Sequence, residues 1–398
     1  MGLLDGVRVV SLNHFLAGPA AAQLLGDMGA DVIAVEPTGG AFQRGWAVAG
    51  RFVDGQSVNF LCTGRNKRSL AVDLKSPEGR AIVERLIAGA DIVMENFRPG
   101  AMVRLGFDPA RLLADYPRLI YAAASGFGAD GPYKDRPGQD LLLQAMSGLA
   151  AHTGPAEGPP TAVGSVVIDH HAAALYAMAI SAALYARERT GKGGRIDVSL
   201  LQAAVDLQGE SIAAWMNGAA HEGPRGPGGV AAWFSAGGYG IHETADGAIA
   251  ISMAAPKTLG DALGIAALEE FADADSLPRR AEITALVRET VRTRPTAHWV
   301  ERLDAAGVWN ARVEDYDDLK NNPQLKHLGA FTEMPGATGA HITMVSHPVR
   351  YDGAAPEVRL VPQPLGAQTR EILAEAGYGA DDIERLISAG TVKAEDAA

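Results

Sequence analysis

Short apolar segments alternate with helical segments along the amino-terminal third of the chain, and this order limits the fold more than any other feature. Val7–Leu12 and Asp31–Glu36 read as buried strands, and Pro19–Met28 between them reads as a helix with a proline near its first turn. The pattern recurs, with strands expected at Arg68–Asp73, Asp91–Glu95 and Leu119–Ala124 and helices at Ser76–Ala88 and Pro109–Tyr116. Such alternation favours a parallel, helix-covered sheet with right-handed crossovers, which is the α/β class.

A glycine- and proline-rich stretch at residues 222–229 is typical of a hinge between domains. After it the chain continues with a strand at Ala248–Ser252 and helices at Arg279–Arg292 and Ala297–Ala306, which we assign to a smaller second domain. The pattern changes again near Pro335, and the chain ends in two short helices.

Composition excludes several classes of function. The chain has 398 residues, of which 47% are hydrophobic, and it is long enough for two domains and a sizeable core. Its net charge of −12 disfavours nucleic acid or an anionic membrane surface as the main partner. The single cysteine, Cys62, excludes an intramolecular disulfide framework and is expected to be a small buried residue.

The sequence predicts neither export nor a membrane span. The amino terminus lacks a basic region followed by a long apolar one, and it lacks a myristoylation motif. The longest apolar run, Ala172–Ala186, is shorter than the roughly 20 residues that cross a bilayer, so a buried helix is expected there. We therefore expect a cytoplasmic protein.

Asp169 lies between an apolar stretch, Ala162–Ile168, and the long alanine-rich run, so a carboxylate occupies the start of a predicted helix. Helix starts favour carboxylates, because their unpaired N–H groups and the helix dipole are attractive to negative charge. Position alone favours a helix cap, since Asp is among the preferred capping residues, and leaves a catalytic acid as the alternative.

Basic residues lie close to the predicted strands. Arg65-Asn-Lys-Arg68 precedes one strand, Lys75 follows it, and Arg98 and Arg104 follow the next. If these cations line one crevice they suit a phosphorylated nucleotide, whereas the alternative is a solvated basic turn. Phe97 could stack on a flat ring or fill the core. The phosphate loop of ATPases and the Gly-x-Gly-x-x-Gly dinucleotide motif of the first turn are both missing, which disfavours ATP hydrolysis and hydride transfer.

No metal site is predicted. His170 and His171 are adjacent, so on a helix they point about 100° apart and cannot chelate one ion together. Asp140 is a second candidate acid, or else the cap of a helix that begins at Leu141.

Several strings of residues resemble the class III coenzyme A transferase family, which contains formyl-CoA and carnitine-CoA transferases and acyl-CoA racemases. They are Leu16-Ala-Gly-Pro19, Gly29-Ala-Asp-Val-Ile33, Asn66-Lys-Arg-Ser69, Glu95-Asn-Phe-Arg-Pro-Gly100, Ser125-Gly-Phe-Gly128 with Gly131-Pro132, Thr190-Gly-Lys-Gly193, Pro364-Leu-Gly-Ala-Gln-Thr369 and Ala376-Gly-Tyr-Gly379. The resemblance therefore covers essentially the whole chain.

This resemblance implies a fold and a partner. The expected fold is a Rossmann-like large domain formed by residues 1–220 with 335–398, and a small α+β domain at 225–334. Two chains are expected to interlock as rings in a homodimer. The substrates are an acyl-CoA and a free carboxylic acid, and no tightly bound cofactor is expected.

The resemblance also implies roles for individual residues. Asp169 matches the family's nucleophile. The implied coenzyme A contacts are Val72, Asp73, Leu74, Lys75, Asn96, Phe97, Arg98 and Arg104, and Gln139 and Asp140 are expected on the acyl side. In the implied mechanism Asp169 forms a mixed anhydride with the donor acyl group, then an aspartyl-CoA thioester that the acceptor acid attacks.

Two departures from the family pattern argue against formate or oxalate as a substrate. Leu16 stands where the formyl-CoA branch has Gln, and Ala236–Gly240 is a poor match to its glycine-rich flap. Trp233, Phe234 and Tyr239 could line the acceptor pocket or pack structurally.

Two other functions remain as alternatives. An acyl-CoA racemase would need a base where this chain has Gln139, although His170 or His171 could substitute. A CoA-binding protein without turnover is the other alternative.

Overall fold

The computed structural model describes residues 2–220, 223–336 and 339–395, whose contacts group into two compact units. The first unit contains the chain up to Leu143, then Val166–Leu207, and the chain from Gln324 onward. The second contains Gln144–Ser165 and Gln208–Pro323. Compared with the domain ranges proposed from the sequence, residues 144–165 and 208–220 group with the middle of the chain, and residues 324–334 group with its ends.

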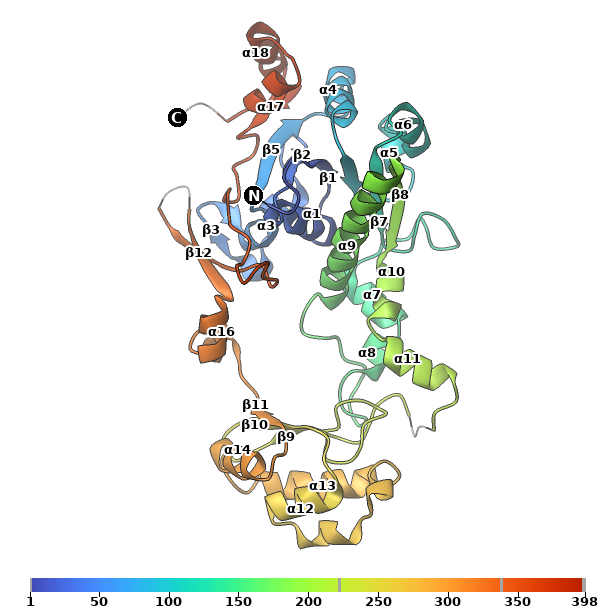
Figure 1. Ribbon diagram of the computed structural model, residues 1–398, viewed down its shortest axis with the longest axis vertical. Helices are drawn as coiled ribbons and strands as arrows, with labels where there is room; N and C mark the ends of the chain where they lie inside the picture. The colour runs from blue at the N-terminus through green and yellow to red at the C-terminus, as the bar shows by residue number, and fades with distance from the viewer. Residues whose placement is uncertain (1, 221–222, 337–338, 396–398) are drawn as a thin grey trace. The chain divides into compact units, whose positions relative to one another are not determined.

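The first unit is built on a seven-stranded sheet with the order β14-β5-β2-β1-β6-β7-β8 (Figure 1). Six strands are parallel, and the short β14 pairs antiparallel with β5. The strands are β1 Arg8–Leu12, β2 Asp31–Glu36, β5 Lys67–Val72, β6 Ile92–Glu95, β7 Ile120–Ser125, β8 Gly194–Ser199 and β14 Val392–Lys393. This confirms the predicted α/β class and the strands predicted before residue 125.

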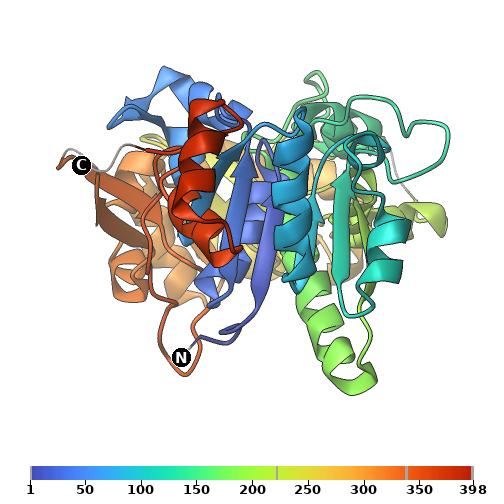
Figure 2. The same ribbon diagram turned by 90° about the horizontal axis from the view of Figure 1, so that it is seen from above.

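Helices cover both faces of this sheet, because successive strand residues point to opposite sides. Val10 and Leu12 of β1 face a core shared with α4 (Pro77–Ala88), α17 (Thr369–Glu375) and α18 (Ala380–Ser388). Figure 2 shows these helices in front of the strands, α4 in blue and the C-terminal pair in red. Val9 faces the other core, which packs against α1 (Ala17–Asp27) and α9 (Val167–Thr190).

The long helix α9 is only partly buried. By length and composition alone it is the one helix among the described residues that could cross a membrane. Ala173, Ala177 and Ile180 pack on the sheet, whereas Met178 and Tyr185 are 62% and 66% exposed. The predicted buried helix is therefore correct for one face and wrong for the other, because the sheet covers only one side of it.

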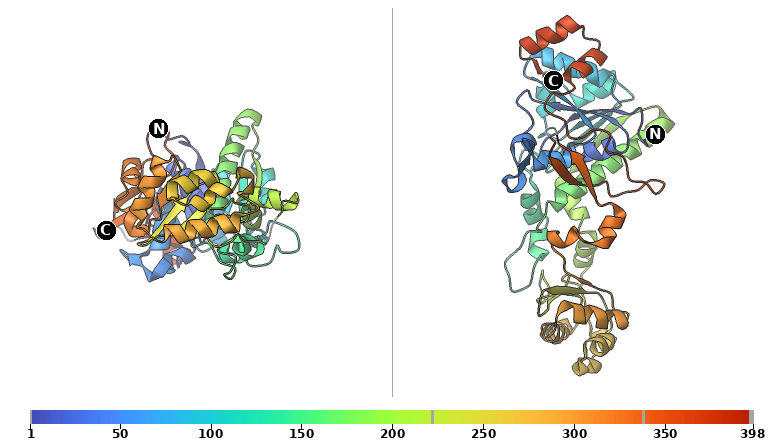
Figure 3. Two further views of the ribbon diagram at one scale, coloured as in Figure 1. Left: turned by 90° about the horizontal axis from the view of Figure 1, so that it is seen from below. Right: turned by 90° about the vertical axis from the view of Figure 1, so that its left-hand side faces the viewer.

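The second unit has a three-stranded antiparallel sheet, ordered β11-β10-β9, that packs against helices. Its main elements are β9 Gly240–Glu243, β10 Ala248–Ile251, β11 Asn310–Arg312, α12 Pro256–Leu263, α13 Arg280–Val291 and α14 Thr296–Ala305. Ile249, Leu259 and Ile283 lie in the core of this unit, and Figure 3 shows its yellow and orange helices side by side.

The remaining elements are short. The helices are α2 Phe42–Gly45, α3 Val58–Thr63, α5 Ala101–Arg104, α6 Pro109–Asp115, α7 Asp140–Met146, α8 Leu149–His152, α10 Leu200–Asp206, α11 Gly209–Met216, α15 Tyr316–Leu319 and α16 Pro323–Leu328, with 3₁₀ turns at Val48–Gly50, Ala266–Glu270 and Asp273–Asp275. The strands are β3 Phe52–Val53, β4 Gln56–Ser57, β12 Phe331–Pro335 and β13 His341–Val345.

Cys62 corrects a sequence expectation. It lies on α3 between the buried residues Leu61 and Thr63, but it is itself exposed. Adjacent helix residues point in different directions, so a buried helix face does not bury every position on the helix.

Candidate active site

Asp169 lies inside the first turn of α9 and does not cap it. The capping position is Val166, which makes no side-chain hydrogen bond to the helix. The capping role belongs instead to Asp140, whose Oδ2 accepts the N–H groups of Ile168 at 2.8 Å and Asp169 at 3.0 Å. The capping interpretation favoured for Asp169 is therefore wrong. Asp140, expected either as an acid or as the cap of the helix after it, instead caps the start of α9.

The side chain of Asp169 is consequently available for chemistry. It is half-buried, and no hydrogen bond to its carboxyl group is found among the described residues. Burial, and secondly the nearby Asp140 carboxylate, raises the pKa of Asp169 to about 7. A carboxyl group with this pKa changes charge in the range where enzymes use acids, bases and nucleophiles.

A small apolar cluster that includes Ile168, the residue before Asp169, joins three helices. Leu143 of α7, Ile168 and Ala172 of α9, and Leu200 and Ala203 of α10 are buried together. This packing fixes the start of α9 against its neighbours. Gln139, the residue before Asp140, is exposed.

The two histidines beside Asp169 differ in their surroundings. His171 Nε2 lies 2.8 Å from Asp206 Oδ2 of α10, whereas His170 is exposed. Among the described residues no group of three or more His, Cys, Asp or Glu side chains could hold a metal ion.

Three cations follow the carboxyl ends of neighbouring strands. Lys75 lies in the turn after β5, Arg98 lies in the turn after β6, and Arg104 lies on α5. All three are exposed, and none forms an ion pair within the described ranges. Val72 is buried at the end of β5, and Asp73 and Leu74 in the turn after it are partly buried. Asp73 Oδ1 accepts the N–H of Lys75 at 2.9 Å.

Asn96 and Phe97 connect the turn after β6 to the turn after β1. Asn96 Oδ1 accepts the N–H of His14 at 2.8 Å, and Asn96 Nδ2 donates to the His14 carbonyl oxygen at 2.8 Å. The ring of Phe97 stacks on the His14 ring at 5.3 Å between centroids. The structure thus places two of the predicted contacts in a bridge between neighbouring loops.

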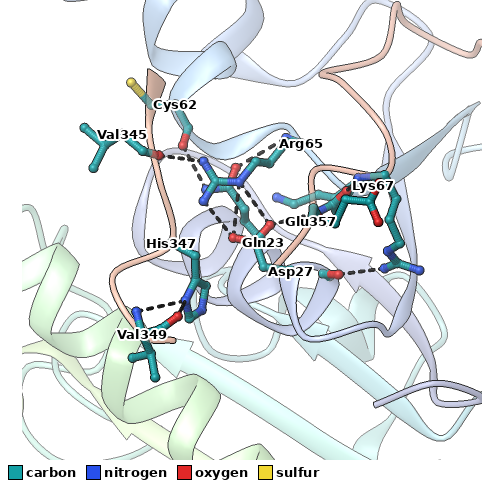
Figure 4. A network of polar contacts seen from close by, with 12 residues as sticks. Gln23, Asp27, Cys62, Arg65, Lys67, Val345, His347, Val349 and Glu357 are labelled. Atoms are coloured by element: carbon teal, nitrogen blue, oxygen red, sulfur yellow. Dashed lines mark hydrogen bonds and ion pairs between the residues drawn. The ribbon is translucent and has the colours of Figure 1, made fainter. Parts of the chain in front are cut away.

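The basic segment Arg65–Arg68 does not join this group, which corrects the prediction of one crevice. Arg65 is buried and pairs with Asp27 at 2.7 Å (Figure 4). Arg68 pairs with Asp31 at 2.7 Å and also with two glutamates of α17. Lys67 Nζ donates to the Pro19 carbonyl oxygen at 2.6 Å, and burial lowers the pKa of Lys67 to about 7. Because β5 begins at Lys67, Arg65 and Arg68 lie at the amino end of the strand, whereas the buried Lys67 side chain reaches the first turn of α1, which follows the carboxyl end of β1.

The middle of the chain gives no support for a pocket at Trp233. This side chain is buried within the second unit, donates from Nε1 to Ser211 Oγ at 2.7 Å, and meets the rings of Trp215 and Phe234 edge to face. Its contacts are those of a packing residue.

One buried acid was not singled out from the sequence. Glu95 ends β6 directly before Asn96, and burial raises its pKa to about 7. The available signal was a charged residue at the end of an otherwise apolar strand, within the string Glu95–Gly100.

The fold and the site together define an α/β protein with a parallel sheet. Exposed cations lie at the carboxyl edge of the sheet, and an acid that does not cap its helix lies in the first turn of that helix. Residues 4–369 match the model of CoA-transferase family III, and the chain therefore belongs to this family and is a CoA-transferase. The recognition made from the sequence is confirmed.

Several known proteins resemble this chain over most of its length. Acetyl-CoA:oxalate CoA-transferase of Acetobacter aceti is 33% identical over 88% of this chain and 90% of that protein. Succinyl-CoA:glutarate CoA-transferase of Mus musculus is 33% identical over 98% of this chain and 90% of that protein. Among solved structures, a CAIB/BAIF family protein from Brucella suis superposes with a TM-score of 0.82 at 30% identity, covering 94% of this chain and 100% of that chain.

Proposed function

We propose that this enzyme transfers CoA from an acyl-CoA donor to a free carboxylic acid through covalent intermediates on Asp169. The observation that carries the proposal is the Asp169 carboxyl group, which accepts no hydrogen bond from the described parts of the chain, at a helix start where Asp140 accepts the N–H groups. A carboxylate that is not needed for capping can act as a nucleophile.

The proposed reaction consists of four balanced exchanges. The Asp169 carboxylate attacks the donor thioester, and CoA thiolate leaves as the mixed anhydride forms. The thiolate then attacks the aspartyl carbonyl, which gives an aspartyl-CoA thioester and releases the donor acid. The acceptor carboxylate attacks this thioester and displaces CoA again, and CoA finally attacks the acceptor acyl group, which restores Asp169. Every intermediate is an activated acyl compound, so no ATP is required.

The turns at the carboxyl edge of the sheet suit coenzyme A. Open parallel sheets bind ligands at this edge, and Lys75, Arg98 and Arg104 offer charges to phosphate groups. We assign Val72–Lys75, Asn96–Arg98 and Arg104 to coenzyme A. We assign Gln139 to the acyl side, where Asp140 holds the backbone of Asp169 in place.

A racemase is the weaker alternative. It would need a second base opposite Asp169, but position 139 is Gln, and His171 is already hydrogen-bonded to Asp206.

We also propose a cytoplasmic homodimer of interlocked chains, as the family resemblance implies. Its support is the outer face of α9, where Met178 and Tyr185 are exposed and would be covered by a second copy. Light scattering that gives the mass of a stable monomer would contradict the dimer.

The test of the proposed chemistry is to trap the acyl intermediate. The wild-type enzyme is incubated with a panel of acyl-CoA donors and hydroxylamine, and peptides are analysed by mass spectrometry. A hydroxamate on Asp169 is expected in the wild type, whereas Asp169→Asn should bind CoA but form no hydroxamate and show no turnover. Asp381→Asn is the matched control, because Asp381 is an exposed acid in the first turn of α18. Turnover by Asp169→Asn at the wild-type rate would overturn the proposal.

A further inference from the structure

Glu95 is a buried acid that the proposed chemistry does not use. It is the last residue of β6 and is 9% exposed, so its carboxyl group lies at the carboxyl end of the sheet, beneath the turn that follows. Burying a carboxyl group is unfavourable unless hydrogen bonds compensate for the lost water. The Glu95 carboxyl group is therefore expected to accept hydrogen bonds from nearby donors.

Those partners are a turn and a neighbouring strand. Glu95 Oε2 accepts the backbone N–H of Phe97 at 2.8 Å. The buried phenol of Tyr121, on β7, donates to Glu95 Oε1 at 3.2 Å. One carboxylate oxygen thus fixes the turn, and the other is held by the sheet.

The backbone of Glu95 is also tied to the helix that carries Asp169. The fully buried hydroxyl of Tyr176 donates to the carbonyl oxygens of Glu95, at 3.1 Å, and Ala122, at 2.5 Å. Tyr176 follows Asp169 on α9 by about two helical turns. Glu95 therefore lies between the Asn96–Arg98 turn and α9.

We infer that Glu95 is a positioning residue for coenzyme A: its carboxylate holds the Asn96–Arg98 turn in the shape that presents Phe97 and Arg98 to the ligand, and protonation weakens that hold. This inference rests on the proposed assignment of the turn to coenzyme A. The carboxylate accepts both hydrogen bonds as charge-assisted ones, which are roughly twice as strong as neutral ones, whereas a protonated Glu95 leaves one neutral oxygen to accept the Phe97 N–H.

The charges around Glu95 place this protonation in the physiological range. Burial raises the pKa of Glu95 to about 7, while the hydrogen bonds from Phe97 and Tyr121 and the charge of Arg195 act to lower it, and Asp197 acts to raise it. Arg195 and Asp197 lie on β8 and pair with each other at 2.8 Å, and Tyr176 approaches from α9. Since the carboxylate is the form that holds the turn, affinity for coenzyme A should fall as the pH drops below about 7.

Two substitutions separate shape from charge. Gln in place of Glu95 has, like the protonated acid, one neutral oxygen to accept the Phe97 N–H and a donor group toward Tyr121, so it imitates the low-pH form and cannot titrate. Ala removes the carboxyl group that accepts from both partners and leaves the Phe97 N–H and the Tyr121 hydroxyl without it, which should weaken CoA binding about tenfold. At saturating acyl-CoA, kcat of Glu95→Ala should change little, because the variant acts on binding.

The measurement is the dissociation constant of CoA by calorimetry between pH 6 and pH 8, in an Asp169→Asn background so that Asp169 does not titrate. We expect Glu95→Gln to bind CoA at pH 8 a few-fold more weakly than its parent, as the parent itself does at low pH, and to show no further weakening as the pH falls, apart from the part due to the CoA 3′-phosphate, which has a pKa of ~6. Tyr121→Phe, which keeps the packing, should weaken binding in the same direction as Glu95→Ala but less.

The outcomes distinguish this inference from the assignment on which it depends. If Arg98→Ala weakens CoA binding but Glu95→Ala does not, the turn binds CoA and Glu95 does not position it. If neither variant changes binding, the assignment of the turn itself fails. If Glu95→Ala does not fold, a Glu95→Gln variant that keeps the full pH dependence of its parent would still overturn the inference.

Discussion

The two ends of the parallel sheet hold their basic residues in opposite states. At the amino end Arg65 is buried against Asp27, with side chains 5% and 2% exposed, and Arg68 is shared by Asp31 and two glutamates of α17. At the carboxyl end Lys75 and Arg98 are exposed, and neither forms an ion pair within the described parts of the chain. Basic residues beside strands therefore have two roles. Arg65 and Arg68 stabilise the fold through ion pairs, whereas Lys75 and Arg98 are exposed and available to bind a ligand.

The acids show the same division. Asp27 and Asp31 at the amino end are neutralised by arginines. Because α9 leads into the amino end of β8, its first turn lies toward the carboxyl end of the sheet, and there Asp169 has an acid, Asp140, as its neighbour instead of a base. Ion pairs stabilise the amino end of the sheet. The carboxyl end instead has exposed cations and an acid, Asp169, whose pKa is raised.

The largest effect is expected when the buried pair at the amino end is broken. Arg65→Met leaves the Asp27 carboxylate buried with Asn66 Nδ2 as a remaining partner at 2.7 Å. Breaking a buried ion pair on one side typically costs about 3–5 kcal/mol of the free energy of unfolding. Urea unfolding followed by circular dichroism should show this loss, while the folded variant should bind CoA as the wild type does.

A double variant checks the cause of that loss. Arg65→Met combined with Asp27→Leu removes both charges and should recover much of the stability, since buried pairs can often be replaced by apolar residues. An Arg65→Met variant of wild-type stability, or one with weakened CoA binding at unchanged stability, would contradict the claim that the basic residues at the amino end stabilise the fold and do not bind CoA.

The next effect belongs to the carboxyl end. Arg98→Ala should raise the dissociation constant of CoA by about tenfold, the size of one lost charged hydrogen bond, and should change the stability by less than about 0.5 kcal/mol. The weakening should diminish at high salt, because exposed charges are screened. Calorimetric titration with CoA at low and high salt measures both effects.

Arg111→Ala is the matched control for Arg98→Ala. Arg111 is also an exposed arginine of the same unit, but it pairs with Glu84 at 2.7 Å and Asp115 at 3.0 Å. Its removal should leave CoA binding unchanged and cost at most about 1 kcal/mol of stability. Equal effects of the two variants on binding would mean that net charge, not position, attracts the ligand.

The sequence predicts the centre of the sheet better than its edge and its charges. The central strands are recognisable because both faces are buried and most of their residues are apolar. The edge strand β8 was not predicted, since it alternates partly buried residues with the exposed Arg195 and Asp197. Basic residues at 65–68 could not be assigned, because their partners Asp27, Asp31 and Glu375 come from distant parts of the chain.

The acid at position 169 shows the same limit at the site. Its place at a helix start is evident from the sequence, but its freedom depends on Asp140, a residue of another helix that supplies the cap. Local sequence gives the helix boundary, whereas only the fold shows which carboxylate satisfies the N–H groups.

The pH dependence of Asp169 sharpens the contrast between the acids. Because its pKa is raised to about 7 and the carboxylate is the nucleophile, hydroxamate formation with a saturating donor should rise with pH through 7 and level off above it. At pH 6 the rate should be about a tenth of the plateau, since one pH unit below the pKa leaves about a tenth of the group ionised. A rate that is independent of pH between 6 and 8 would contradict a titrating nucleophile.

The smallest effect is expected for Asp140→Asn. The Asn carbonyl can still accept the N–H groups of Ile168 and Asp169, so the start of α9 should keep its geometry, but the negative charge that raises the pKa of Asp169 is removed. The midpoint of hydroxamate formation should therefore move to lower pH, and the rate at pH 6 should increase a few-fold, while the plateau at high pH stays near that of the wild type. Burial is the larger cause of the raised pKa, so the midpoint should remain above that of an ordinary aspartate. A midpoint that moves upward would mean that Asp140 supports the carboxylate of Asp169 instead of opposing it, and the acids of the carboxyl end would then resemble the compensated acids of the amino end.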